Sequence, residues 1–313
     1  MVRALRALSL PLFLLVVLAE RSAAAACAPG KMVLVTGGTG RTGAIASRLL
    51  LKQGYCLRLF TRNASKARAM FEGVPRWQLS AFEGELGDSR SVRAAFDAND
   101  VVAPSSPPSP PISHVLFAAG GEQADYDAVN NRGLSYCAAE AGKLRAHVVV
   151  ISAAWVTRPF SIAAVLFNSL YDDPMALHLI GENTLRATPG LTYVVLRPGA
   201  LVPDADFDAS AGCGDGVRMA QGDNFGFLEA GMPGLAFTPL AKLLVTSLLS
   251  PTQARVTVSG LCASNGGREG RTGGQVCCVR ERTDLGMLCI RIGGRGGVGV
   301  TIGCRSRDCL SIS

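Results

Sequence analysis

The chain has 313 residues, of which 48% are hydrophobic and 18% are charged, which is enough for one α/β domain of about 200–250 residues with extensions. The net charge of +7 is modest, and much of it lies in the C-terminal tail and near the N-terminus instead of on one basic face with aromatic residues. This distribution argues against a nucleic-acid-binding protein, and we expect no nucleic-acid partner.

The first 29 residues have the pattern of a targeting segment. Arg3 and Arg6 precede an apolar run from Leu8 to Ala19, and small residues follow, which is typical of a secretory signal peptide. The run is shorter than the about 20 residues that a membrane span needs. We therefore expect no span in the mature chain, with an uncleaved anchor as the alternative, and a folded part that begins near Gly30.

From Lys31 onward, short apolar runs alternate with helical patterns. The runs predict strands and the patterns between them predict helices. In chain order the expected strands are 32–36, 55–60, 77–82, 114–119, 147–152 and 192–198, and the expected helices are 41–54, 89–97, 125–142 and 175–188. This alternation predicts an α/β fold with a doubly wound parallel sheet of the Rossmann type, because crossovers between parallel strands are right-handed.

Two stretches interrupt the alternation. The proline-rich stretch 101–113 cannot supply the N–H groups of a strand ladder and is expected to be a surface insertion. After residue 200 the pattern loosens, and it recovers in an expected helix at 240–249 and an expected strand at 255–260. We therefore expect one domain over 30–260, with a small substrate lobe in its C-terminal part, and an irregular, disordered Gly/Arg/Cys-rich tail over 261–313.

Ten cysteines do not predict a disulfide framework, because the chain is too large for a small disulfide-rich domain. The tail holds six of them without a CxxC pair and without a histidine, so no metal site is expected there. These six are Cys262, Cys277, Cys278, Cys289, Cys304 and Cys309.

A glycine-rich turn joins the first expected strand to the first expected helix, in the stretch VTGGTGRTG. Gly37 allows a tight turn, Gly40 lets the backbone approach a pyrophosphate, and Gly43 allows close packing of helix on strand. The helix N-terminus then faces the negative charge. The turn predicts a dinucleotide site whose contacts come from Gly37, Thr39, Gly40, Arg41, Thr42 and Gly43.

The end of the second strand favours NADP(H) over NAD(H). An NAD site usually has Asp or Glu there for the ribose hydroxyl, but this chain has Arg62, with Ser65 and Lys66 close by. A guanidinium suits a 2′-phosphate, because it can form two parallel hydrogen bonds to it.

Several stretches, in order along the chain, resemble one family. They are VTGGTGRTG, LFTRNASKA, FEGELGD, AVNNRG, VVVISAA and ENTLRATPGLTYVVLRPGAL, which run from about residue 31 to 202. In these stretches the chain resembles the atypical short-chain dehydrogenase/reductases of the NmrA-like, NAD(P)-binding type. The resemblance implies a Rossmann-type fold and an oxidoreductase-like function.

The resemblance also implies further cofactor contacts. Glu85, where the family usually has Asp, and Leu86 would lie against the adenine; Ala118, Ala119 and Gly120 would line the cofactor; Pro198, Gly199 and Ala200 would pass near the nicotinamide. Asn130 matches the asparagine of the family's VN helix, and Asp88 is expected to cap the helix that follows it.

The catalytic positions depart from the family. Active members use a tyrosine as proton donor and a lysine four residues later that lowers the pKa of the phenol, which is otherwise near 10. Counting back from Glu182, His178 stands at the lysine position and Pro174 at the tyrosine position, while Tyr171 is the nearest phenol. Ser152 matches the serine at the end of the fifth strand.

Two hypotheses follow from these departures. In the first, Ser152, Tyr171 and His178 form an altered catalytic set in an NADP(H)-dependent oxidoreductase acting on a small carbonyl or quinone-like substrate. In the second, the protein binds NADP(H) as a non-catalytic redox sensor or assembly protein, because histidine is a poorer phenol activator than lysine. The pattern identifies neither the substrate nor the oligomeric state.

A glycosylation sequon at Asn63 conflicts with a cofactor site beside it in the secretory lumen. Passage through the secretory route to another organelle would remove this conflict. We therefore expect entry by the signal peptide, with a plastid or other organelle reached by that route as the alternative.

Overall fold

The computed structural model describes residues 27–97, 109–121, 123–171, 173–204, 218–221, 235–249, 256–262, 276–279, 288–292 and 298–302. Residues 1–26 of the expected signal segment 1–29 and most of the proline-rich insertion therefore lie outside the described residues. Within the described part no helix is long and apolar enough to cross a membrane.

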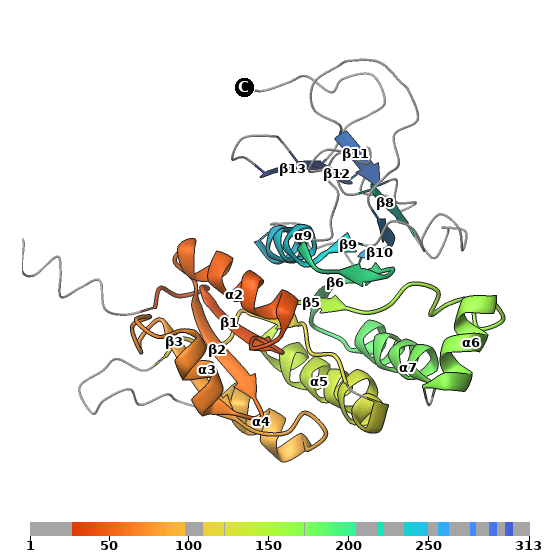
Figure 1. Cartoon of the computed structure of the whole chain (residues 1–313). Coiled ribbons are helices and arrows are strands. Elements are labelled where there is room, and N and C mark those ends of the chain that lie inside the picture. Colours follow the sequence, from red (N-terminus) through yellow and green to blue (C-terminus); the bar gives the residue numbers. More distant parts are fainter. Residues whose placement is uncertain are drawn as a thin grey trace, which may run out of the picture.

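One large sheet forms the centre of the molecule (Figure 1). Its order is β3 (Leu79–Glu83), β2 (Cys56–Thr61), β1 (Met32–Thr36), β4 (His114–Phe117), β5 (His147–Ile151), β6 (Thr192–Pro198), β10 (Val256–Cys262) and β8 (Arg218–Gln221). The edge strand β8 is antiparallel to β10, and the other neighbours are parallel. The predicted doubly wound parallel sheet is confirmed.

Helices cover both faces of this sheet. On one face, α2 (Arg41–Lys52), α3 (Ala64–Met70) and α9 (Phe237–Leu249) pack on Val33, Val35, Leu57 and Leu59. On the other face, α4 (Ser89–Asp97), α5 (Leu134–Leu144) and α7 (Pro174–Ala187) cover Leu34, Val115, Val148 and Val150. Because both faces are covered, all five residues of β1 are buried, which explains its uninterrupted apolar run.

Smaller elements surround this core. Two short turns, η1 (Gln123–Asp125) and the π-helix η2 (Asp127–Gly133), lead into α5, and α6 (Ile162–Leu170) precedes α7. The strand β7 (Leu201–Val202) pairs with β9 (Leu235–Ala236). Sequence patterns did not predict α3, α6 or β8, because these elements are short and α6 is apolar around most of its circumference.

The tail contains three short strands among its described residues. These are β11 (Val276–Val279), β12 (Leu288–Ile292) and β13 (Val298–Ile302), which form a small antiparallel sheet. The sequence indicated little regular structure in this part of the chain.

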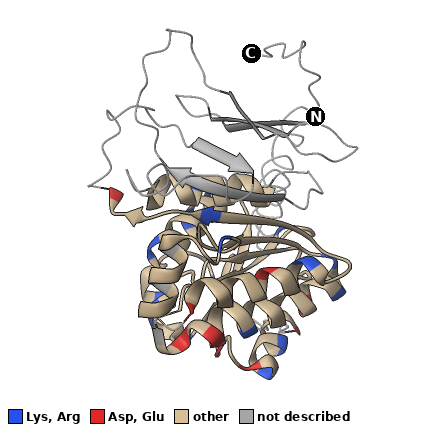
Figure 2. Ribbon diagram, turned by 90° about the vertical axis from the view of Figure 1, so that its right-hand side faces the viewer, with Lys and Arg blue, Asp and Glu red and all other residues tan. Residues whose placement is uncertain are grey.

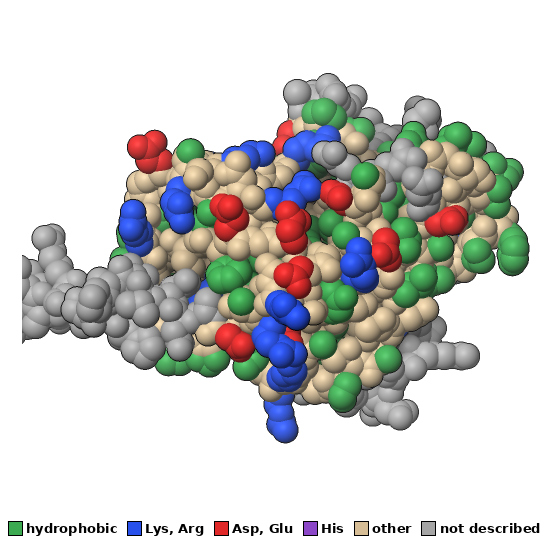
Figure 3. Space-filling model, turned by 90° about the horizontal axis from the view of Figure 1, so that it is seen from below, with side chains coloured by type: hydrophobic (Ala, Val, Ile, Leu, Met, Phe, Trp, Pro, Cys, Tyr) green, Lys and Arg blue, Asp and Glu red, His purple; other side chains and the backbone are tan. Residues whose placement is uncertain are grey.

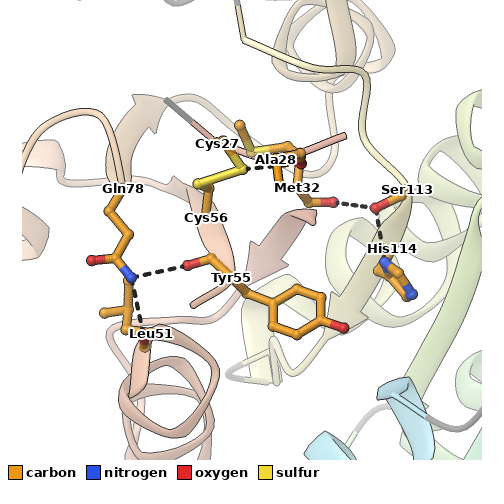
Figure 4. Close-up of a disulfide and its surroundings, with 9 residues drawn as sticks. All are labelled: Cys27, Ala28, Met32, Leu51, Tyr55, Cys56, Gln78, Ser113 and His114. Carbon is orange, nitrogen blue, oxygen red and sulfur yellow. Dashed lines mark hydrogen bonds between the residues drawn. A yellow bond between two sulfur atoms is a disulfide. The ribbon is translucent and has the colours of Figure 1, made fainter. Parts of the chain in front are cut away.

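A disulfide joins Cys27 to Cys56, with their Cα atoms 5.9 Å apart (Figure 4). The sequence analysis did not predict it. The strand register brings the two cysteines together. Cys56, the first residue of β2, pairs with Met32 at the start of β1, and Cys27 lies on the segment that leads into β1. The packed part of the chain therefore includes Cys27, three residues before the expected start at Gly30.

On the described residues, positive and negative side chains are mixed on the surface. Lys and Arg are interspersed with Asp and Glu along the helices (Figure 2), and both signs occur on the face seen from below (Figure 3). Several of them are paired across the surface, as in Arg132 with Asp127 at 2.7 Å.

Candidate functional site

The strand order reverses direction at β1, which has β2 on one side and β4 on the other. In open α/β sheets, ligands bind beyond the carboxyl ends of the strands at such a switch point. The glycine-rich turn follows β1 at this place, as the sequence predicts.

The glycines of this turn are required by close backbone contacts. Gly37 has a φ of +69°, and a Cβ on it would lie 2.5 Å from the carbonyl oxygen of Ala118. A Cβ on Gly43 would lie 2.2 Å from the carbonyl oxygen of Gly37. The N–H of Gly40 donates to that same oxygen at 2.9 Å. Any side chain at Gly37 or Gly43 would displace backbone, so the turn keeps its shape only with glycine there.

The N-terminus of α2 is suited to bind an anion. Gly40 caps the helix without a side-chain hydrogen bond, and the first turn contains no acidic residue. Its backbone N–H groups and the positive end of the helix dipole thus have no competing carboxylate from that turn. Thr39 is half-buried and Thr42 is buried, while the Arg41 guanidinium lies 4.7 Å from the centre of the Phe237 ring.

The ends of β2 and β3 carry the residues expected near the adenosine. Arg62 follows β2 directly and forms an ion pair with Asp125, Nη1 to Oδ2 at 2.8 Å. Asn63 caps α3, because its Oδ1 accepts a hydrogen bond from the Lys66 N–H at 2.8 Å. Beyond β3, Glu85 is exposed and Leu86 is half-buried.

Asp88 has the capping role that the sequence predicts. Its Oδ1 accepts a hydrogen bond from the Arg90 N–H at 3.0 Å, at the start of α4. This carboxylate therefore stabilises a helix end.

The end of β4 borders the glycine turn. The N–H of Ala118 donates to the carbonyl of Thr36 at 3.1 Å, which holds this segment level with the end of β1. Gly120 has open space where a Cβ would lie: no atom in the part of the chain that the structure describes comes within 4 Å. Together with the close-packed Gly37 and Gly43 and the uncapped helix end, this opening fits a bound dinucleotide.

A buried charge cluster lies at the ends of β5 and β6. Ser152 Oγ donates to Glu182 Oε1 at 2.6 Å, and Arg197 Nη2 donates to Glu182 Oε2 at 2.6 Å. Arg197 Nε also donates to Oε1 at 3.0 Å, and Arg186 Nη2 reaches Oε2 at 2.5 Å. The sequence analysis did not predict the Glu182–Arg197 pair. Both residues stand in the stretch ENTLRATPGLTYVVLRPGAL, which resembles the family, and their shared presence there was the available signal.

The cluster also fixes the start of the segment expected near the nicotinamide. The N–H of Ser152 donates to the Leu196 carbonyl at 2.7 Å, and that of Ala154 donates to the Pro198 carbonyl at 2.9 Å. Pro198 is buried and Gly199 is half-buried.

His178 cannot replace the charge of the family's lysine at neutral pH, because its pKa is lowered. Desolvation by burial lowers its pKa to about 4, although the nearby Glu182 carboxylate acts in the opposite direction. The ring is therefore neutral at pH 7. It lies one turn before Glu182 on α7, so His178 is close enough to the cluster to feel the charge of its carboxylate.

Tyr171 lies in the connection between α6 and α7 and is 42% exposed. Beside it, α6 presents apolar side chains to the surface, among them Ile162, Leu166 and Leu170. Figure 3 shows hydrophobic side chains gathered at this end of the molecule. The surface of α6 before this connection is thus apolar and accessible.

Asn130 is buried within η2, and neither polar atom of its side chain has a hydrogen-bond partner among the described residues. Buried amides without partners are uncommon and call for an explanation such as a bound water or ligand. π-Helical turns often occur at functional sites, and this turn packs against α7 at Gly181, where a Cβ would lie 2.2 Å from the Asn130 carbonyl oxygen.

Comparisons with known proteins agree with this site. A family model described as NAD(P)H-binding matches residues 37–215. Protein TIC 62, chloroplastic, from Pisum sativum is 26% identical over 198 residues, which cover 56% of this chain and 34% of that protein. The chain thus spans about a third of the length of this relative.

Solved structures share the fold. A short-chain dehydrogenase/reductase from Veillonella parvula in complex with NADP has a TM-score of 0.52 at 14% identity, covering 73% of this chain and 93% of that one. ChuY, an anaerobillin reductase from Escherichia coli O157:H7, has a TM-score of 0.51 at 19% identity, covering 73% and 95%.

The family model covers more than half of the 313 residues, and its span begins at the glycine turn. The glycine turn and the uncapped helix N-terminus at the switch point of the sheet lie at the start of that span. The chain therefore belongs to the NAD(P)H-binding family.

Proposed function

We propose that the protein is an NADP(H)-dependent oxidoreductase that reduces a small carbonyl or quinone-like substrate. The observation that carries the proposal is that two anion-binding features occur beyond the ends of neighbouring strands: the uncapped N-terminus of α2 after β1, and Arg62 after β2. The first binds a pyrophosphate, and the second matches the 2′-phosphate that distinguishes NADP(H) from NAD(H).

The protein's own groups would bind the carbonyl and supply a proton, while the reduced nicotinamide supplies a hydride when bound. Tyr171 is the candidate proton donor. The Ser152 hydroxyl already donates its hydrogen bond to Glu182, so toward a substrate its oxygen can act only as an acceptor. The neutral ring of His178 can hold or pass on a proton near the same cluster, but it cannot lower a phenol pKa by its charge.

The apolar surface of α6 supports an apolar substrate. Leu166 and Leu170 are 54% and 57% exposed on α6, the helix that ends just before Tyr171, and exposed apolar surface of this kind on a folded protein usually marks a binding site. Quinones and aryl carbonyls have the matching chemistry.

The test is NADPH oxidation by the full chain against a panel of quinones and carbonyls. We expect turnover that falls at least tenfold in Tyr171→Phe and His178→Ala and is unchanged in Tyr136→Phe, a matched change in α5. Turnover that is unaffected in the first two variants would remove these residues from the mechanism.

A second function is favoured by the altered catalytic positions. Pro174 begins α7 where the family's tyrosine would stand, and His178 is neutral. A cofactor-binding redox sensor or assembly protein needs neither a phenol nor a lysine. Tight NADPH binding without turnover on any member of the panel would support this function over the first.

We infer that the chain enters the secretory route, with a plastid or another organelle reached by that route as the alternative. The signal-like pattern before Cys27 and the Cys27–Cys56 disulfide support entry, and the chloroplastic relative supports the alternative. Disulfides persist in oxidising compartments and are rare in the cytosol. A fluorescent fusion of the first 40 or so residues tests it, and a uniform cytosolic signal would refute it.

A further inference from the structure

An ion pair crosses the site at the switch point of the sheet. Arg62 follows β2, and Asp125 ends η1, which follows β4. Since β1 lies between β2 and β4, the pair extends over the carboxyl end of β1, where the glycine turn begins. The bond joins Arg62 Nη1 to Asp125 Oδ2 at 2.8 Å.

The pair engages the group that NADP(H) would need. A guanidinium that binds a 2′-phosphate through two parallel hydrogen bonds has to turn its N–H groups toward that phosphate. Here one of those groups is directed at a carboxylate from the other side of β1. A phosphate monoester carries about −1.5 to −2 charges at neutral pH, so Asp125 would also repel it.

We propose that Asp125 is a specificity-determining residue that competes with the 2′-phosphate for Arg62 and so weakens the preference for NADP(H) over NAD(H). The inference rests on the proposed NADP(H) site. NAD(H) has a hydroxyl in place of that phosphate, so it does not compete with Asp125 for the Arg62 guanidinium.

The exposure of the two side chains makes the exchange feasible. Arg62 is 62% and Asp125 is 37% exposed, and exposed ion pairs contribute little to stability. Breaking this pair therefore leaves the fold intact. The free energy of the pair is small, so its loss on NADP(H) binding would lower the affinity only modestly.

The experiment measures the dissociation constants of NADP⁺ and NAD⁺ by calorimetry, on the full chain, for the wild type and Asp125→Asn. We expect NADP⁺ to bind about 3- to 10-fold more tightly in Asp125→Asn, while the NAD⁺ constant stays within about twofold. The matched control is Asp127→Asn. Asp127 is another exposed carboxylate, paired with Arg132 at 2.7 Å, and its removal changes the net charge equally; both constants should then stay within about twofold.

A double variant shows whether Asp125 acts through Arg62. In an Arg62→Ala background, Asp125→Asn should no longer change the ratio of the two constants, because coupled residues give non-additive effects. The proposal is overturned if the ratio is unmoved in Asp125→Asn, if Asp127→Asn changes it equally, or if the full gain persists without Arg62.

The two proposals fail in different ways. If Arg62→Ala weakens NADP⁺ selectively but Asp125→Asn leaves the ratio unchanged, the NADP(H) site stands and only the role of Asp125 is refuted. If Arg62→Ala weakens both cofactors equally, the NADP(H) assignment fails, and the role of Asp125 fails with it.

Discussion

Ser152 donates a 2.6 Å hydrogen bond to the buried carboxylate of Glu182. The same carboxylate accepts hydrogen bonds from Arg197 and Arg186, so the serine expected in catalysis belongs to a charge network. This network connects the end of β5 to the Arg-Pro-Gly segment of β6. The network holds the ends of β5 and β6 and the middle of α7 together beneath the candidate site, so it has a structural role in addition to any catalytic one.

Glu182→Gln should destabilise the fold strongly. The substitution leaves the buried Arg197 guanidinium without its carboxylate, and breaking a buried pair in this way costs about 3–5 kcal/mol. Urea unfolding measures the change in the free energy of unfolding. As a control, the exposed Asp127→Asn should change it by no more than about 0.5 kcal/mol; equal effects of the two variants would contradict the role of the network.

Stability should fall as the pH drops from about 6.5 toward 4. Burial lowers the pKa of His114 and of His178 to about 4 and also lowers that of His147. In this range the unfolded chain binds protons at these histidines while the folded chain does not, so the stabilisation is complete above pH 6.5 and is lost on acidification. Unfolding in urea at pH 7.5 and pH 5 measures the loss.

His178→Gln should reduce that loss, because it removes one of the groups that titrates in the unfolded state only. A wild type with equal stability at both pH values, or a variant with the same loss as the wild type, would argue against a neutral, desolvated His178.

Reduction of the Cys27–Cys56 disulfide should destabilise the protein without affecting cofactor binding. The two residues are 29 apart in the chain, and closing a loop of this size stabilises the fold by about 3–4 kcal/mol in the chain-entropy model. Cys56 begins β2 and Arg62 follows the last residue of β2. The disulfide therefore lies near the N-terminal ends of the parallel strands, and the cofactor site lies beyond their C-terminal ends. Urea unfolding and NADP⁺ affinity with and without dithiothreitol test both parts.

Cys27→Ser is the control for the reductant. It should have the lowered stability already and show no further response to dithiothreitol. A stability loss in this variant equal to that of the wild type would mean that another disulfide is being reduced.

Gly120→Ala should lower cofactor affinity without destabilising the fold. Among the described residues nothing lies within 4 Å of the added Cβ, so a ligand that lines that space is the group it would displace. Gly43→Ala should instead destabilise the protein, because its Cβ would lie 2.2 Å from a backbone oxygen. Unchanged affinity in Gly120→Ala, measured by fluorescence titration with NADPH, would show that the cofactor does not line Gly120.

The glycine turn, the alternation of strands and helices and the position of Arg62 after a strand could be predicted because each depends on local pattern. The turn needs glycine where backbone meets backbone, and the uninterrupted apolar runs indicate strands covered on both faces. The disulfide and the Arg62–Asp125 pair could not be predicted, because both depend on which strands become neighbours. Nor could the pKa of His178, since a helical pattern does not reveal how much solvent its ring loses.

Affinity for NADPH and NADH in the wild type and in Arg62→Ala tests the NADP(H) assignment most directly. The 2′-phosphate is the difference between the two cofactors, and Arg62 is the cation at the end of β2. We predict tighter binding of NADPH by the wild type, and a selective loss of NADPH affinity of at least about tenfold in Arg62→Ala. Equal losses for NADPH and NADH would contradict the assignment.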